Sequence, residues 1–134
     1  MARILLIDDD DSARSVLRLI LNQFGHLVIE ARNGREGIEL FMDANADLVI
    51  TDIVMPEKEG LEVLKEMRKM IPDVKIIAIS GGGRVNPTDY LRMAKFLGAA
   101  KVLAKPISSA ALIGAINEVL LPIVGAPLQP DLLK

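Results

Sequence analysis

The feature that most constrains the fold is a fivefold alternation of short apolar runs with longer segments of helical period. The apolar runs cover residues 4–7, 26–30, 47–51, 74–79 and 101–104, each short enough for a buried strand. The first intervening segment places Val16, Leu17, Ile20, Leu21 and Phe24 at the spacing of one helix face. Strands that alternate with helices predict a parallel sheet covered on both faces by right-handed crossovers. We therefore expect one α/β domain of five strand–helix units.

Helix starts are marked by capping residues. Asn33 with Glu36 three residues later predicts a helix to about residue 44, and Asn86-Pro87 predicts one to about residue 97. Ser108 or Ser109 caps the last helix, which runs through residues 112–119. The remaining helix, around residues 61–67, stops before the proline at position 72.

The composition indicates one domain with an aliphatic core, in a reducing compartment. The chain of 134 residues is 51% hydrophobic but has only three Phe, one Tyr and no Trp, as suits buried parallel strands. It has no cysteine, which excludes disulfides, thiolate metal sites and cysteine nucleophiles and makes the cytoplasm the expected location. We expect the domain to cover residues 1–121 and a proline-rich tail or linker to cover residues 122–134.

Charge and hydropathy argue against two classes of partner. The 16 basic and 18 acidic residues give a net charge of -2 without a basic face, so direct nucleic-acid binding is not expected. Residues 106–130 carry only Glu118 as a charge, but Pro122, Gly125, Pro127 and Pro130 interrupt any continuous span of about 20 apolar residues. Neither a membrane role nor an export signal is expected.

Polar side chains follow four of the predicted strands. The acidic run Asp8–Asp11 follows the first strand, Asp52 ends the third, Ser80 ends the fourth and Lys105 ends the fifth. Because the carboxyl ends of parallel strands share one edge, these side chains should converge there. Crowded carboxylates require a cation, and oxygen ligands without His or Cys suit Mg²⁺, with Mn²⁺ as a substitute.

Each of these features alone has an ordinary structural explanation. A run of aspartates is typical of a solvated loop or a helix start, and a Lys or Ser at a strand end is usually a surface charge or a turn former. Their joint placement at one edge favours a functional site.

This arrangement resembles the receiver domains of two-component response regulators, the CheY-like superfamily that includes chemotaxis regulators. The resemblance rests on Ile4-Leu-Leu-Ile-Asp8-Asp9, on Asp52-Ile-Val-Met55-Pro56 with Gly60, on Ser80 and on Lys105-Pro106, and it covers about residues 3–121. It implies a doubly wound, flavodoxin-like fold with a five-stranded parallel sheet in the order 2-1-3-4-5.

The resemblance also implies the roles of the site residues. Asp52 is the phosphoacceptor. It receives a phosphoryl group from a sensor histidine kinase or a histidine phosphotransfer protein in a Mg²⁺-dependent phosphorelay. The acidic pair Asp8 and Asp9 forms the metal site together with Asp52 and the backbone carbonyl of Val54. The direct ligands are Asp9, Asp52 and the Val54 carbonyl. Lys105 offsets charge on the transferred phosphoryl group. No other cofactor is implied.

The switch departs from the usual pattern of the family. Ser80 is expected to bind a phosphoryl oxygen and to carry the change into the following loop. Many receivers have an aromatic residue three positions before the lysine, where this chain has Val102, so an aromatic flip cannot be the readout. We expect the loop that begins with Gly81, Gly82 and Gly83 to reorganise instead.

Slow loss of the phosphoryl group is a further expectation. Val54 and Gly82 lie two positions after Asp52 and Ser80, and neither side chain can orient an attacking water. A phosphate cradle formed by the three glycines is disfavoured, because a phosphate loop normally follows the first strand.

Three other functions compete with the phosphoacceptor. An aspartyl-phosphate hydrolase needs two aspartates two positions apart, a spacing that Asp8 and Asp10 satisfy. A flavodoxin-like nucleotide binder is disfavoured by the acidic edge, and a degenerate docking module by the presence of all key residues. His26 is expected to have only a packing role. The sequence does not identify the downstream effector. It also leaves open whether phosphorylation produces a homodimer and whether the chain is a stand-alone regulator or a fragment.

Overall fold

The computed structural model describes residues 1–53, 59–80, 92, 95 and 98–120 of the chain. These residues form one five-stranded sheet of β1 (Arg3–Ile7), β2 (Leu27–Ala31), β3 (Leu48–Asp52), β4 (Ile76–Ser80) and β5 (Lys101–Ala104). The strands are all parallel and their order is β2-β1-β3-β4-β5. The α/β class and the order 2-1-3-4-5 are therefore confirmed, with strand limits that lie within two residues of the predicted ones.

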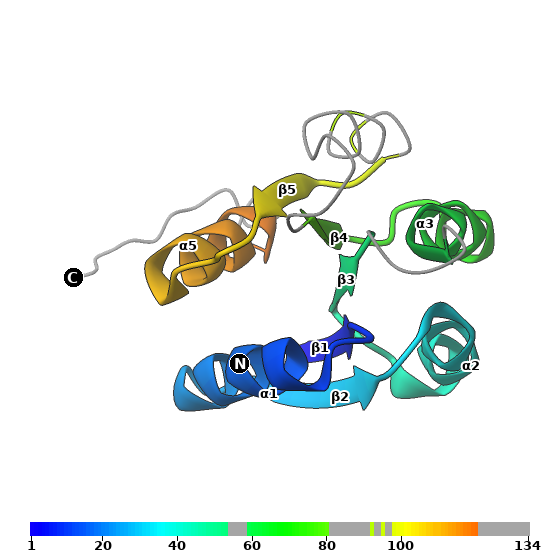
Figure 1. The fold of residues 1–134 in the computed structure, drawn as a ribbon. Helices are drawn as coiled ribbons and strands as arrows, with labels where there is room; N and C mark the ends of the chain where they lie inside the picture. Colours follow the sequence, from blue (N-terminus) through cyan, green and yellow to red (C-terminus); the bar gives the residue numbers. More distant parts are fainter. Residues whose placement is uncertain (54–58, 81–91, 93–94, 96–97, 121–134) are drawn as a thin grey trace.

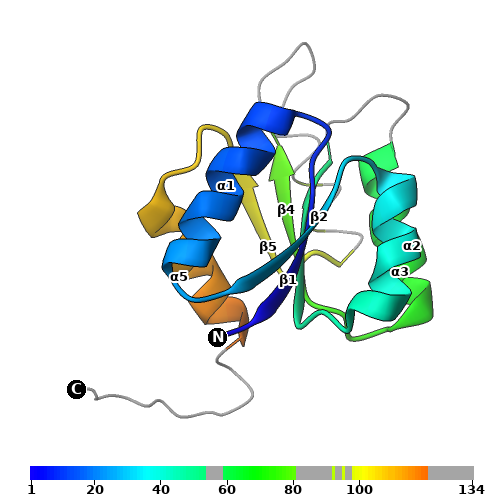
Figure 2. The ribbon, with the colours of Figure 1, turned by 90° about the horizontal axis from the view of Figure 1, so that it is seen from below.

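Helices cover both faces of the sheet. Figure 1 shows α1 (Asp11–Gln23) and α5 (Ser109–Leu120) together on one face, and α2 (Gly34–Ala44) and α3 (Glu59–Met70) on the other. Figure 2 shows the same two layers from below. The predicted helix over residues 87–97 lies outside the described residues except for positions 92 and 95. No helix in the described part of the chain is long and apolar enough to cross a membrane.

Alternating strand residues divide the core into two clusters, because successive side chains of a strand point to opposite faces. Leu5 of β1 packs toward α2 and α3, whereas its neighbour Leu6 packs toward α1 and α5. Helix residues in the first cluster are Phe41, Val63, Leu64 and Met67. Those in the second are Leu17, Leu21, Leu112, Ala115, Ile116 and Val119. With core residues on both faces, β1, β3 and β4 are buried almost throughout, and this fixes the positions of their carboxyl ends.

Side-chain caps set the starts of three helices. Asn33 Oδ1 accepts the Glu36 N–H at 2.8 Å, as predicted, and Ser108 rather than Ser109 caps α5 by accepting the Ala111 N–H at 3.0 Å. Asp10 caps α1. One residue of the acidic run is thereby used for structure.

The buried face of α1 is narrower than predicted. Leu17 and Leu21 are buried, but Val16 and Phe24 are more than half exposed. Consecutive helix residues are turned by about 100°, so the stripe that contacts the sheet runs through Leu17 and Leu21 and leaves Val16 beside it. Its third buried member is Arg14, which the apolar pattern did not reveal.

Candidate functional site

The carboxyl end of the sheet collects four polar side chains from four strands. β3 ends at Asp52 and β4 ends at Ser80, while Asp8 directly follows β1 and Lys105 follows β5. Asp8, Asp52 and Ser80 are buried, and Lys105 is partly exposed. The structure therefore brings these predicted residues to one edge of the sheet.

Lys105 contacts two of the buried carboxylates. Its Nζ donates to Asp52 Oδ2 at 2.9 Å and to Asp8 Oδ2 at 3.3 Å. Burial on its own would lower the pKa of Lys105, but the hydrogen bonds and charges of Asp52 and Asp8 outweigh it and raise the pKa above the ordinary value of 10.5. The ammonium thus stays charged between the two carboxylates. The peptide bond that follows it, between Lys105 and Pro106, is cis.

Three carboxylates form a group with the dimensions of a metal site. Asp8, Asp9 and Asp52 each offer an oxygen, and these oxygens lie within 4.8 Å of one another. Asp9 is exposed, so the group opens to solvent on one side. An all-oxygen donor set fits a hard divalent cation that keeps several of its waters. The charge balance also fits, because Lys105 alone does not neutralise three carboxylates.

Ser80 has an unused hydrogen-bonding group. Its Oγ is buried and has no hydrogen-bond partner among the described residues. A buried hydroxyl without a partner is unfavourable by about 1–3 kcal/mol, so such groups are uncommon. An incoming anion at the carboxyl end of the sheet is a fitting partner for this hydroxyl.

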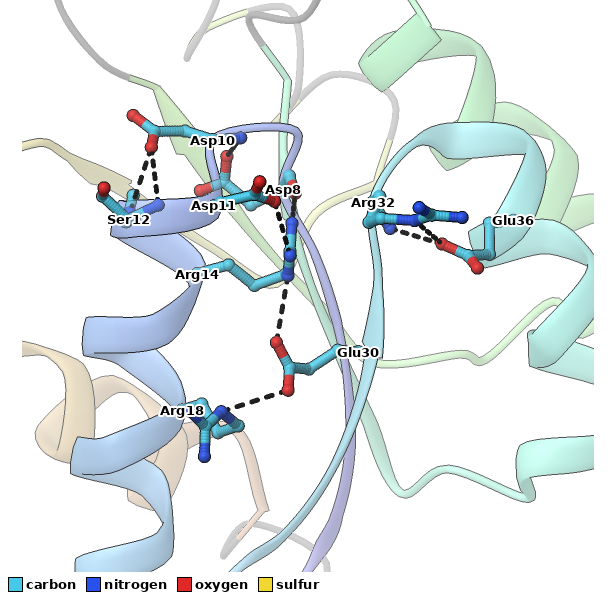
Figure 3. Close-up of polar contacts among 10 residues, drawn as sticks. Asp8, Asp10, Asp11, Ser12, Arg14, Arg18, Glu30, Arg32 and Glu36 are labelled. Atoms are coloured by element: carbon cyan, nitrogen blue, oxygen red, sulfur yellow. Dashed lines mark hydrogen bonds and ion pairs between the residues drawn. The ribbon is translucent and has the colours of Figure 1, made fainter.

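Arg14 is a residue that the sequence analysis missed. Its Nη1 donates to the backbone carbonyl of Asp8 at 2.7 Å, and its Nη2 donates to Asp11 Oδ1 at 2.7 Å (Figure 3). Its Nε donates to Glu30 Oε1, at the end of β2, at 3.0 Å. A signal was present in the sequence, because Arg14 precedes Leu17 and Leu21 at the spacing of the buried helix face.

Arg18 lies one turn further along α1 and shares the same carboxylate. Its Nε contacts Glu30 Oε2 at 3.1 Å, so Glu30 links the two arginines (Figure 3). Arg18 is more exposed than Arg14, and its described ion pair is with Glu30 and not with the acidic run. Both arginines are therefore on α1 and contact Glu30, but in the part of the chain that the structure describes only Arg14 also contacts the acidic run, through the Asp8 carbonyl and the Asp11 carboxylate.

Some predicted residues lie elsewhere or outside the described part. Val54 and Gly81–Gly83 are outside it, so the backbone ligand and the switch loop stay predictions. Val102 is half-buried and packs on the core that faces α3. Asp10 is not in the metal-sized group, and its Oδ1 accepts the N–H groups of residues 12 and 13. This use as a cap disfavours the hydrolase interpretation, which requires a free second acid.

His26 lies away from the acidic site, as predicted, at the turn before β2. Its Nδ1 accepts the Ala2 N–H at 3.0 Å. Burial, with a smaller effect of the N-terminal ammonium, lowers the pKa of His26 below its ordinary value of 6.5. The residue therefore joins the N-terminus to the start of β2.

An apolar groove of about 520 Å³ adjoins the site. It is lined by α1 and by the segment after β5, with Val16, Pro106 and Ile107 as its apolar walls and Lys105 at one side. Lys105 therefore both lines the groove and contacts Asp52.

Comparisons with known proteins agree with this geometry. Residues 4–117 match the family model of the response regulator receiver domain. The chain is 35% identical to the chemotaxis protein CheY of Thermotoga maritima, covering 87% of this chain and 96% of that protein. It is 34% identical to the protein PilH of Pseudomonas aeruginosa, covering 90% and 98%. The crystal structure of a receiver domain from Clostridium thermocellum superposes with a TM-score of 0.83 at 32% identity, covering 92% of this chain and 97% of that one.

Proposed function

Because the chain belongs to the response regulator receiver family, we propose that Asp52 accepts a phosphoryl group from a phosphohistidine of a sensor histidine kinase or a histidine phosphotransfer protein. As a receiver domain, the chain acts in two-component signalling and not as a conventional enzyme. The observation that carries the assignment is the position of Asp52, buried at the end of β3 with the Lys105 ammonium 2.9 Å from its Oδ2.

The proposed transfer uses the chain's own residues at defined atoms. An Asp52 carboxylate oxygen attacks the phosphorus, and the bond from phosphorus to the donor nitrogen breaks with its electron pair left on the imidazole, which then takes a proton. Lys105 Nζ offsets negative charge on the phosphoryl oxygens, and Ser80 Oγ donates to one of them in the acyl phosphate product. A Mg²⁺ or Mn²⁺ ion held by Asp8, Asp9 and Asp52 supplies further positive charge there.

The mass of the intact protein tests the assignment. After incubation with acetyl phosphate and Mg²⁺, the wild type is expected to gain one phosphoryl group, and Asp52→Asn is expected to gain none because the nucleophilic carboxylate is lost. A chelator should prevent the wild-type adduct. An adduct of equal yield on Asp52→Asn would contradict the assignment of Asp52.

We further propose that the groove beside Lys105 receives the protein that donates the phosphoryl group. The donor histidine has to reach Asp52, and the groove is an apolar surface that shares Lys105 with the contacts of that residue. Val16 on its wall is 56% exposed and lines the groove together with Pro106 and Ile107, so the groove presents contiguous apolar surface of the kind that marks interaction sites.

Val16→Asp tests this docking surface. Transfer from a phosphorylated histidine kinase is expected to slow about tenfold, because a charge then enters an apolar contact, while phosphorylation by acetyl phosphate stays within about twofold. The donor used in this test is the histidine kinase that phosphorylates the wild type fastest among purified kinases of the host organism. Leu19→Asp is the matched control, since Leu19 is also 56% exposed on α1 but does not line the groove. Equal losses in both variants would count against the groove.

We propose residues 1–121 as the receiver unit with residues 122–134 as a tail, a cytoplasmic location, and an effector that recognises the phosphorylated form.

A further inference from the structure

The backbone is held at the peptide unit between Asp8 and Asp9 and on both sides of it. The Asp8 N–H donates to the Ala31 carbonyl at 3.1 Å, and Asp8 Oδ1 accepts the Asp10 N–H at 3.0 Å. The Asp8 carbonyl accepts from Arg14 Nη1 at 2.7 Å. Since the peptide bond is planar, a fixed carbonyl also fixes the direction in which the chain reaches the Cα of Asp9.

This constraint affects the one exposed member of the carboxylate group. Asp8 and Asp52 are buried and contact Lys105, whereas Asp9 is exposed at the start of the loop between β1 and α1. Its carboxylate stays within 4.8 Å of the other two only while its backbone keeps this position. A contact that holds this backbone in place therefore favours the convergence of the three oxygens.

We propose that Arg14, braced by Glu30, is a positioning residue that holds the Asp8–Asp9 peptide in the orientation that binds the divalent cation. The inference rests on the metal site of the proposed function and adds the residues that set its affinity. Arg14 does not touch the cation; it acts through the Asp8 carbonyl. Groups of this kind, which orient the direct ligands, typically change metal affinity by about 10- to 100-fold when replaced.

The shape of the guanidinium explains why an arginine occupies this place. Each of its three nitrogens has a separate acceptor, namely the Asp8 carbonyl, Asp11 Oδ1 and Glu30 Oε1. The planar fork presents its donors in fixed directions, so anchoring two nitrogens directs the third at the carbonyl. A lysine ammonium at the same position has the charge but not the fork. Arg14→Lys therefore separates positioning from charge.

Binding of Mn²⁺ to the whole protein tests the inference, with free Mn²⁺ followed by electron paramagnetic resonance. The dissociation constant is expected to rise about tenfold in Arg14→Lys and at least as much in Arg14→Gln. Arg18→Lys is the matched control, because Arg18 lies on the same helix and contacts the same Glu30 carboxylate. It should bind Mn²⁺ within about twofold of the wild type. Thermal unfolding in chelator identifies the folded variants, and Arg14→Lys serves if Arg14→Gln does not fold.

The Mg²⁺ dependence of phosphorylation by acetyl phosphate distinguishes positioning from a general structural role. Arg14→Lys is expected to need about tenfold more Mg²⁺ for half of its maximal rate and to reach the wild-type rate at saturation. Glu30→Gln should shift the Mg²⁺ midpoint in the same direction by a smaller factor, because it removes the brace and leaves the carbonyl contact. A merely structural role would lower the unfolding temperature without moving the midpoint.

Two results would overturn the inference. Unchanged Mn²⁺ affinity in Arg14→Lys, with wild-type binding that Asp9→Asn abolishes, would refute the role of Arg14 and leave the metal site standing. An equal loss of affinity in Arg14→Lys and Arg18→Lys would assign the effect to a general disturbance of α1 and its pairing with Glu30, and not to the contact between Arg14 and the Asp8 carbonyl. If the wild type itself bound no Mn²⁺, the metal site of the proposed function would fail and this inference with it.

Discussion

Lys105→Met is expected to slow the phosphorylation of Asp52 by acetyl phosphate about 100-fold or more at saturating Mg²⁺. Lys105 Nζ lies 2.9 Å from Asp52 Oδ2 and 3.3 Å from Asp8 Oδ2, so its charge is already in place where negative charge gathers during transfer. Removing one such preorganised group typically slows the chemical step by about 10²- to 10³-fold. Methionine keeps most of the apolar stem and removes the ammonium. The rate at which the phosphoryl adduct appears in the intact mass measures the effect.

Lys101→Met is the matched control for this prediction. Lys101 opens the strand that Lys105 follows, but its ammonium pairs with Glu118 of α5. Because this pair is largely solvent-exposed, its loss is expected to change neither the rate by more than about twofold nor the stability by more than about 1 kcal/mol. A wild-type rate for Lys105→Met, or equal losses in the two variants, would refute the role of Lys105.

The topology was predictable because the relevant signals repeat along the chain. Each strand is a short apolar run, and its successive buried residues face the two helix layers in turn. The caps at Asn33 and Ser108 lie where their helices start. The convergence of Asp52 with Lys105 followed from parallel strands alone. Since parallel strands place all their carboxyl ends on one edge, no contact needed to be known in advance.

The contacts around the acidic run were not predictable from periodicity. Four consecutive aspartates look alike in the sequence, but in the structure Asp8 is buried, Asp9 is exposed and Asp10 caps α1. These differences arise from where α1 starts, and the exact start of a helix is the least reliable part of a prediction from sequence. Likewise, the buried face of α1 consists of Arg14, Leu17 and Leu21, and a search for apolar residues at helical spacing finds only the two leucines.

The site of the metal-free protein combines stabilising and repulsive contacts. Lys105 and Arg14 hold the acidic residues in place, while Asp8, Asp9 and Asp52 oppose one another within 4.8 Å. Like charges at such a distance repel by a few kcal/mol at most in a partly solvated site, and by less where one partner is exposed. Pre-formed ligands of this kind favour cation binding at the expense of stability in its absence. Changing the exposed ligand is therefore expected to have opposite effects with and without the cation.

Asp9→Asn is expected to stabilise the metal-free protein and to abolish its stabilisation by Mg²⁺. In chelator, the loss of one like charge should raise the free energy of unfolding by about 1 kcal/mol, a few degrees in melting temperature. With Mg²⁺ at about 100 times its dissociation constant, the wild type should gain about 2.7 kcal/mol. Asp9→Asn should gain little, because one of the three carboxylates is gone, so the order of the melting temperatures reverses. Calorimetry of both proteins with chelator and with Mg²⁺ measures this reversal.

Asp10→Asn separates the metal site from the charge of the acidic run. It removes a neighbouring negative charge, but Asp10 lies outside the group of three carboxylates, and asparagine caps a helix about as well as aspartate does. We therefore expect it to retain the full Mg²⁺ stabilisation of the wild type. If Asp9→Asn also retained that stabilisation, Asp9 would not be a ligand. If Asp10→Asn lost it, the cation would be bound by the overall charge of residues 8–11 and not by the geometry at the ends of β1 and β3.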